Sequence, residues 1–274
     1  MTKVSIIIPC YNHGKYVDEA VASCLNQTYQ DIEIIIVNDG SIDAMTNELL
    51  SHYQKPKTRV ITTQNQGLAM ARNTGIQAAK GVYILPLDAD DRIAPTYIEK
   101  AVKILDTNPK IGIVYCNAEF FGAQQGIWSL PEYSLATELN GNCLFCTSLF
   151  RKEAWEQVGG YKKEMKYGWE DYEFWLSLLE KGCEVYKIPE VLFYYRQHVT
   201  ASMLKSIDEE KRNYLYNVIF SFHQDLYKTH KKFLKADIKQ LFKAYNHAFF
   251  YKSKTATHRI YHIGKFTLKF KRKK

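Results

Sequence analysis

Residues 82–91 read VYILPLDADD, an apolar run that passes directly into acidic residues. A short apolar run containing Val and Ile is typical of a strand buried on both faces of a sheet. Two carboxylates, Asp88 and Asp90, leave that strand together, and buried charges of this kind are costly without a partner. The stretch therefore predicts a buried strand with a polar site at its carboxyl end.

The residues before this stretch repeat the same arrangement. Apolar strands are expected at Val4–Pro9, Ile32–Val37 and Arg59–Thr63, with helices between them at Tyr16–Leu25, Ala44–His52 and Leu68–Ala79. This alternation predicts an α/β fold with a Rossmann-like, mostly parallel central sheet and helices on both faces. Ligands bind beyond the carboxyl ends of such strands, so three loops are expected to face one crevice: Pro9–Asn12, Asn38–Ser41 and Asp88–Asp91.

The second half of the chain continues with less regular alternation. Helices are expected at Thr96–Asp106, Lys152–Val158 and Glu170–Lys181, and strands at Gly112–Phe121, Asn142–Phe150, Val185–Ile188 and Leu192–Tyr195. From Asp208 the apolar spacing becomes helical. We expect a catalytic domain over residues 1–204, with a nucleotide-binding half to about residue 110 and an acceptor half over about 111–204. A basic helical extension is expected over 205–274.

Charge is distributed unevenly along the chain, whose net charge is +8. Residues 1–204 hold 19 Lys and Arg against 24 Asp and Glu, whereas residues 205–274 hold 18 against 5. A basic tail of this kind favours contact with phosphates. Arg259–Lys274 interleaves apolar and basic residues, which suits peripheral contact with an anionic membrane, or equally a helical annex that packs on the catalytic domain. The acidic body argues against nucleic acid as the partner.

The start of the chain passes straight into a strand, and no window is apolar enough to predict a membrane span or a secretory signal. Six cysteines lie among apolar neighbours. Cys143 and Cys146 form a CxxC without a second pair at zinc spacing, so free thiols are favoured. We expect a cytoplasmic protein, with a peripheral position at the inner face of the plasma membrane as the further possibility.

Asp88-Ala89-Asp90 suits a hard divalent cation, either Mg²⁺ or Mn²⁺. Mg²⁺ takes one or two carboxylates and completes its shell with phosphate oxygens and water. The alternative is a turn that begins the next helix, since Asp91 and Pro95 suit a helix entry. The position of the acids at a strand exit favours the metal.

Four segments together resemble the family 2 glycosyltransferases with a GT-A fold. They occur in the family's order at Val4–Asn12, Val37–Ser41, Asn65–Asn73 and Asp88–Asp91. Trp169-Glu170-Asp171 resembles the family's late acidic motif, and Tyr195–His198 resembles the segment that closes its catalytic domain. The resemblance covers about residues 3–204. Each motif alone is common, whereas the ordered set is specific.

The resemblance implies a nucleotide-sugar site built from Pro9, Tyr11, Asp39, Asn65, Arg72, Asp88, Ala89 and Asp90. Tyr11 would lie against the base, since an aromatic face can stack there. Asp39 would accept hydrogen bonds from base or ribose, although turn chemistry with Gly40 explains it too. Arg72 would donate to the diphosphate with its planar fork, or form a surface salt bridge.

The resemblance also implies that Asp90 binds the metal and that Asp171 is the general base of an inverting transfer. A carboxylate there takes the acceptor's proton while C1 of the sugar is attacked. A helix cap explains one of the two adjacent acids equally well. Trp169 and Glu170 belong on the acceptor or sugar side, with core packing the alternative for Trp169. His198 would complete the metal site, or is an ordinary surface or core histidine.

These features predict a metal-dependent inverting glycosyltransferase that moves a hexosyl or N-acetylhexosaminyl group. The donor is expected to be a UDP-sugar, and the acceptor a saccharide or lipid-linked saccharide in cell-surface polysaccharide or glycolipid assembly. Two alternatives stay open. A sugar nucleotidyltransferase would normally show a Gly-rich phosphate loop, which Pro9–Asn12 does not supply. A non-catalytic nucleotide-sugar-binding scaffold is distinguished only by activity.

Overall fold

The computed structural model describes residues 3–199, 207–250, 252–254, 258–263 and 266–271. The chain divides into two compact units. The first comprises Met1–Tyr133 and Asn142–Ser206, and the second comprises Ser134–Gly141 and Ile207–Lys274. The division near residue 206 lies close to the boundary expected at 204, but the short segment at 134–141 groups with the C-terminal residues.

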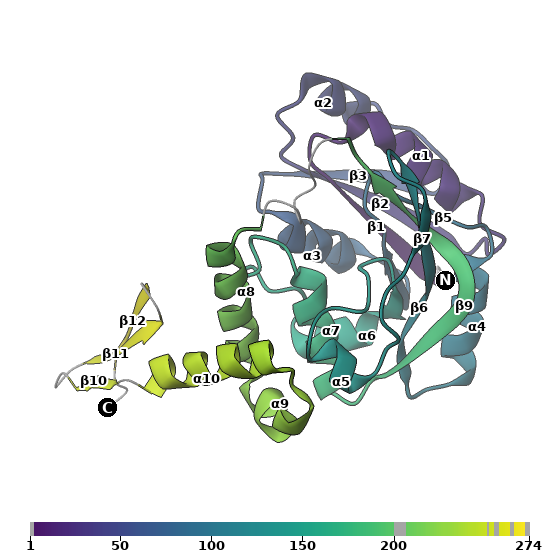
Figure 1. Cartoon of the computed structure of the whole chain (residues 1–274). Helices are drawn as coiled ribbons and strands as arrows, with labels where there is room; N and C mark the ends of the chain where they lie inside the picture. The colour runs from purple at the N-terminus through teal and green to yellow at the C-terminus, as the bar shows by residue number, and fades with distance from the viewer. Residues whose placement is uncertain (1–2, 200–206, 251, 255–257, 264–265, 272–274) are drawn as a thin grey trace. The chain divides into compact units, whose positions relative to one another are not determined.

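A nine-stranded sheet forms the centre of the first unit (Figure 1). Its strands run in the order β3 (Thr58–Thr63), β2 (Ile32–Asp39), β1 (Val4–Cys10), β4 (Tyr83–Pro86), β8 (Leu149–Arg151), β6 (Ile111–Gly122), β9 (Glu184–Gln197) and β5 (Arg92–Ile93), while β7 (Gly126–Trp128) pairs with β6. Strands β1 to β4 are mutually parallel, and so are β6 and β9. Strands β5, β7 and β8 run antiparallel to their neighbours, so the sheet is mixed.

Helices cover both faces of the parallel strands, which confirms the α/β fold class. Figure 1 shows α1 (Gly14–Leu25) and α2 (Ala44–Ser51) on one side of β1 to β3 and α3 (Leu68–Ala78) on the other. Every residue of β1 is buried, as expected for a strand covered on both faces. Three further helices follow in this unit: α4 (Tyr97–Thr107), α6 (Lys152–Val158) and α7 (Glu170–Glu180).

Close approach of α3 to the sheet depends on Gly75. A Cβ atom there would lie 2.4 Å from Cγ2 of Ile7 and 3.1 Å from Cγ2 of Val37. Both isoleucine and valine belong to the fully buried core. The absence of a side chain therefore sets how near the helix axis comes to β1 and β2.

The chain order brings polar loops together at one edge of the sheet. Strand β1 lies between β2 and β4 in the sheet, although β2 is the next strand along the chain and β4 is the third after β1. Such a reversal of strand order opens a crevice beyond the carboxyl ends. The three loops expected to meet, at 9–12, 38–41 and 88–91, all follow strands of this parallel group.

Two expectations for the second half of the first unit were wrong. Of the expected strand 142–150, only Leu149 and Phe150 lie in the sheet, as the first two residues of β8. Asn142 Oδ1 accepts from the backbone N–H of Leu144, and Ser148 donates its backbone N–H to the carbonyl of Cys146, so local hydrogen bonds replace ladder bonds. The two short strands at 185–195 are one strand, β9, whose register against β6 shifts around Cys116 and Asn117 and so absorbs the interruption at Pro189.

The second unit begins as expected and ends differently. It contains α5 (Leu135–Glu138), α8 (Glu209–Phe222), α9 (Gln224–Thr229), the 3-10 helix η2 (Lys231–Phe233) and α10 (Ala236–Phe250). The helical extension expected over 205–274 is then corrected, because β10 (Lys252–Lys254), β11 (His258–Ile263) and β12 (Phe266–Lys271) form a small antiparallel sheet. Phe266–Lys271 alternates apolar and polar residues, which is the period of a strand.

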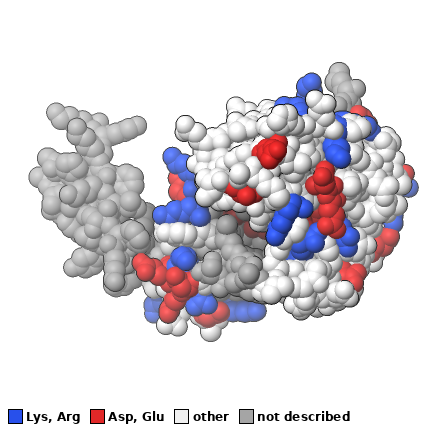
Figure 2. All heavy atoms as spheres, turned by 90° about the horizontal axis from the view of Figure 1, so that it is seen from above, with Lys and Arg blue, Asp and Glu red and all other residues white. Residues whose placement is uncertain are grey.

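Surface charge on the described residues is interspersed. Figure 2 shows acidic and basic side chains lying next to one another on one face, with large areas that carry neither. In the part of the chain that the structure describes, no helix has the length and apolarity needed to cross a membrane.

Candidate active site

The carboxylate of Asp39, at the end of β2, holds the loop that precedes α3. It is 3% exposed and accepts from the backbone N–H groups of Gln66 (3.0 Å) and Gly67 (2.8 Å) and from the hydroxyl of Thr63 (3.2 Å). Gly40 has φ +65°, and a Cβ there would lie 2.4 Å from the backbone nitrogen of Asn65. Asp39 and Gly40 thus bring Asn65 to the end of β2, where it is exposed.

The loop after β1 is hydrogen-bonded to the loop after β2. Asn12 has φ +57°, and its side-chain oxygen accepts from the backbone N–H groups of Ile42 (2.8 Å) and Asp43 (2.9 Å). This leaves the neighbouring Tyr11 side chain 44% exposed at the same edge. Pro9 is buried within β1, and Ala89 is buried in the loop after β4, so neither presents a side chain to solvent.

Arg72 lies on α3 and is 1% exposed. Its Nη2 donates to Oδ1 of Asp88 at 2.6 Å, and its Nη1 donates to Oε1 of Glu170. The structure therefore joins the Asp88 loop to the start of α7 through one guanidinium. Both terminal nitrogens meet carboxylates, but these salt bridges are buried and not the surface salt bridge of the alternative. A role of Arg72 toward a diphosphate stays a prediction.

Asp171 occupies the first turn of α7 and points differently from Glu170. Its Oδ2 accepts from Nδ2 of Asn142 at 3.1 Å, whereas Glu170 is buried against Arg72. Burial, and then the negative charge of Glu170, raises the pKa of Asp171 to about 7. A carboxyl with a pKa near neutral pH can both accept and release a proton, which is what a general base requires.

The turn before α7 is strained at Trp169. This residue has φ +60°, which non-glycine residues seldom adopt, and its ring lies edge-on to that of Tyr172 with 6.2 Å between centroids. Such strain clusters at functional sites. Trp169 is half-buried, so its side chain packs on one side and is accessible on another.

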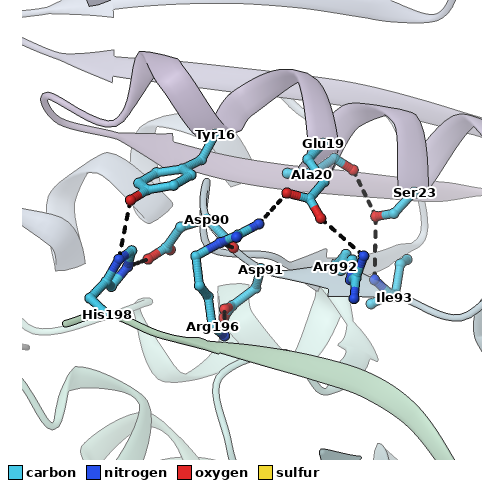
Figure 3. Close-up of polar contacts among 10 residues, drawn as sticks. All are labelled: Tyr16, Glu19, Ala20, Ser23, Asp90, Asp91, Arg92, Ile93, Arg196 and His198. Carbon is cyan, nitrogen blue, oxygen red and sulfur yellow. Dashed lines mark hydrogen bonds and ion pairs between the residues drawn. The ribbon is translucent and has the colours of Figure 1, made fainter. Parts of the chain in front are cut away.

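Asp90 and His198 meet although 108 residues separate them. Nε2 of His198 lies 2.6 Å from Oδ2 of Asp90, and Nδ1 of His198 lies 3.2 Å from the hydroxyl of Tyr16 (Figure 3). Nδ1 of His13 lies 3.9 Å from Oδ1 of Asp90. Both Asp90 and His198 are partly exposed, with side-chain exposures of 15% and 23%.

A carboxylate and an imidazole side by side are a donor set that Mn²⁺ accepts, and the pair fits a cation that a diphosphate also ligates. Among the described residues, no group of three or more His, Cys, Asp or Glu side chains forms a metal cage. The protein would thus supply Asp90 and His198, and phosphate oxygens and water would supply the rest.

Asp91 has a different task from Asp90. It is 1% exposed, and its Oδ1 accepts from the backbone N–H of Arg196 at 2.8 Å. Burial, with the nearby charges of Asp90 and Asp88, raises its pKa well above the usual range. Asp91 therefore supports the loop from within, whereas the side chains of Asp88 and Asp90 stay partly exposed, at 27% and 15%.

Sequence reasoning missed several residues of this site. Asn142 touches Asp171, Cys146 Sγ lies 3.7 Å from Oδ2 of Asp88, and Tyr16 contacts His198. Arg196 lies within Tyr195–His198, the segment that resembles the end of the family's catalytic domain, but no role was predicted for it. The only sequence signal was their proximity to motifs, because the contacts join residues 29 to 182 positions apart.

Comparison with known proteins identifies the family of the chain. The chain matches the family described as Glycosyl transferase family 2 over residues 5–161. An uncharacterized glycosyltransferase of Rickettsia typhi is 34% identical over 221 residues, which cover 75% of this chain and 68% of that protein. Chondroitin synthases of Pasteurella multocida and Escherichia coli are each 29% identical over 216 residues, or 77% of this chain. Those matches span only 22% and 31% of the two synthases.

Solved structures give the same fold. Staphylococcus aureus TarS 1–349 in complex with UDP-GlcNAc superposes with a TM-score of 0.70 at 19% identity, covering 90% of this chain and 73% of that one. The mannosyltransferase PcManGT of Pyrobaculum calidifontis, in complex with GDP-Man and Mn²⁺, gives 0.59 at 18% identity, covering 82% and 64%. The fold and the site define a glycosyltransferase of the GT-A type. The chain belongs to glycosyl transferase family 2.

Proposed function

We propose that this glycosyltransferase transfers a hexosyl or N-acetylhexosaminyl group, with inversion, from a UDP-sugar to an acceptor hydroxyl. The observation that carries the proposal is the meeting of Asp90 and His198 at 2.6 Å beyond the carboxyl end of β4. A cation site with so few protein ligands leaves coordination positions open, which the phosphate oxygens of a nucleotide could occupy together with water. TarS, with which the chain shares its fold, is described in complex with UDP-GlcNAc, which supports UDP as the nucleotide.

The nucleotide would lie along the edge formed by the loops after β1, β2 and β4. The exposed ring of Tyr11 offers a stacking surface for the base, and Asn65 offers hydrogen bonds nearby. Asp39 would meet the base or ribose while holding the loop before α3. Arg72 would act on the diphosphate mainly by fixing Asp88.

Asp171 would remove the proton from the acceptor hydroxyl as that oxygen attacks C1. The bond from C1 to the diphosphate oxygen breaks on the opposite face, so an α-linked donor gives a β-linked product. When bound at Asp90 and His198, Mn²⁺ or Mg²⁺ supplies positive charge for the leaving diphosphate. Trp169 and Glu170 would border the acceptor side, Trp169 through its accessible ring face.

The acceptor would be a saccharide or lipid-linked saccharide in assembly of a surface polysaccharide or glycolipid. The chondroitin and hyaluronan synthases among its relatives support a polysaccharide. The basic residues 205–274 would add peripheral contact with an anionic membrane at its cytoplasmic face. In this arrangement residues 1–204 form the catalytic domain and 205–274 the extension.

Calorimetric titration of UDP, GDP and dTDP tests the proposal, each with Mn²⁺ and with a chelator. We expect UDP to bind in the presence of Mn²⁺ and to lose at least about tenfold in affinity with the chelator. Asp90→Ala should abolish that metal dependence. Glu156→Gln, on the exposed surface of α6, is the matched control and should bind as the wild type does. A folded protein that binds none of the nucleotides would contradict the transferase.

A further inference from the structure

Arg196, two residues before His198, touches the backbone of Asp90. We propose that Arg196 is a positioning residue that holds Asp90 and His198 together as one divalent-cation site. The inference rests on the proposed function, because it concerns how that pair is assembled. Arg196 would touch neither the cation nor the donor.

The first part of the argument is the pair of hydrogen bonds between residue 196 and the loop after β4. Nε of Arg196 donates to the carbonyl of Asp90 at 2.7 Å, and its backbone N–H donates to Oδ1 of Asp91 at 2.8 Å. Both bonds join the end of β9 to that loop. Since His198 follows two positions later, they also determine where its imidazole lies.

The second part of the argument is helix α1, which contacts both Arg196 and His198. Glu19 accepts from Nη2 of Arg196, and the hydroxyl of Tyr16 lies 3.2 Å from Nδ1 of His198 (Figure 3). Tyr16 and Glu19 are three residues apart, so they share one face of the helix. Ser23, one turn further along that face, accepts from the backbone N–H of Ile93 at 3.3 Å. One helix face thus holds β5 and the end of β9.

The third part is the fixed plane of the guanidinium. Its central carbon lies 4.8 Å from the ring centroid of Tyr16 and 4.3 Å from that of Phe121, and the side chain is 14% exposed. The planar group therefore reaches Glu19 and the Asp90 carbonyl at once. Lysine carries a single nitrogen and cannot reproduce both bonds in this geometry.

Charge and geometry predict opposite effects of removing this arginine. A positive charge beside a cation site repels the cation, so its removal should tighten Mn²⁺ binding if charge alone mattered. Loss of the hydrogen bonds to Asp90 and Asp91 should instead loosen the ligand pair and weaken binding. The sign of the change therefore separates the two effects.

Arg92 provides a matched control within the same network. Its Nη1 donates to Glu19 at 3.0 Å, and its guanidinium carbon lies 4.1 Å from the Phe121 ring centroid. It therefore shares the acidic partner and the aromatic neighbour of Arg196. No contact from the Arg92 side chain to Asp90, Asp91 or His198 is among the interactions of the described residues. Arg92→Met removes the same charge from the same surroundings.

The test measures Mn²⁺ affinity of the full chain with UDP present, by electron paramagnetic resonance of free Mn²⁺. We expect Arg196→Met to weaken Mn²⁺ binding about tenfold or more and Arg196→Lys to weaken it less. Arg92→Met should stay within about twofold of the wild type. UDP affinity with a chelator and the thermal midpoint should match between the Arg196 and Arg92 variants. If Arg196→Met does not fold, Arg196→Lys carries the test.

Three outcomes would overturn the inference alone: unchanged or tighter Mn²⁺ binding in Arg196→Met, equal weakening in Arg92→Met, or wild-type affinity in Arg196→Lys. The last would show that the planar guanidinium, with its two simultaneous hydrogen bonds, is not needed to hold the site. A wild-type protein that binds no Mn²⁺ with UDP would overturn the proposed function, and this inference with it. The wild-type measurement therefore tells the two failures apart.

Discussion

Asp171 is partly buried at the start of α7, and its pKa of about 7 has a consequence for catalysis. We expect Asp171→Asn to lower transfer by a factor of about 10² to 10⁴ while UDP binding is retained, because only the proton acceptor is lost. Initial rates with a UDP-sugar and an acceptor, beside calorimetry with UDP, check this. Wild-type rates in the folded variant would remove Asp171 as the base.

Asn142 should control the pH at which that base works. Its hydrogen bond favours the ionised form of Asp171 and so lowers the pKa. Asn142→Ala should therefore move the acidic limb of the pH–rate profile to higher pH. At pH values below the limb, the transfer rate should fall about threefold for each half unit by which the pKa rises. The rates of the two proteins should converge at alkaline pH. A limb that stays in place or moves to lower pH contradicts this role.

The same carboxyl affects stability with a defined sign. Its folded pKa lies above its ordinary value of 3.8, so the folded state binds the proton more tightly. The associated stability is complete below about pH 4 and is lost as the pH rises through about 7. Asp171→Asn, which cannot ionise, should gain stability over the wild type at pH 8 but not at pH 4. Urea midpoints at the two pH values measure the difference, and an equal gain at both would count against a buried titrating group.

At the scale of elements, the packing of α3 on the sheet makes Gly75 sensitive. Gly75→Ala places a methyl 2.4 Å from Ile7, and overpacking of this kind costs about 1–3 kcal/mol, against a gain of about 1 kcal/mol in helix propensity. We expect a net loss of about 1 kcal/mol in the free energy of unfolding. Gln77→Ala on the exposed face of α3 is the control and should stay within about 0.5 kcal/mol. A stabilised Gly75→Ala protein would mean that the helix can move outward without cost.

Elements were predictable where their burial pattern was simple. Strands β1 and β2 are mostly apolar and almost entirely buried, and their helices have regular apolar spacing. The segment 142–150 has the same apolar character, but side-chain amides and turns compete for its backbone, and those bonds are not visible in a pattern of hydrophobicity. Strands β5 and β7 are two and three residues long, which is too short to show a period.

The candidate site divides in the same way. The acids at strand ends could be located from the sequence, because parallel strands in this order present their ends together. The resemblance added Asp171 and His198. Arg196, Asn142 and Tyr16 could not be assigned, since each acts through a contact made only after the chain has folded, and no local spacing records such contacts.

At the scale of the whole molecule, charge separates the body from the C-terminal residues. Residues 205–274 carry 18 basic and 5 acidic side chains. We expect the full chain to sediment with vesicles that contain anionic phospholipid. Salt at about 0.5 M should release it, because the attraction between the charges is then screened beyond a few ångströms. Replacing the basic residues among 269–274 with Gln should weaken sedimentation. Equal binding to neutral vesicles would show that charge is not the cause.

The meeting of Asp90 with His198 also bears on how the protein is made. During synthesis, the first 110 residues can begin to fold while the histidine has not yet left the ribosome. A nascent chain therefore cannot bind a nucleotide-sugar through this pair until β9 has joined the sheet, a late and non-local step. On the function proposed above, donor and cation would stabilise only molecules in which β9 is in place, and ligand-dependent protection from proteolysis would report completion of the fold.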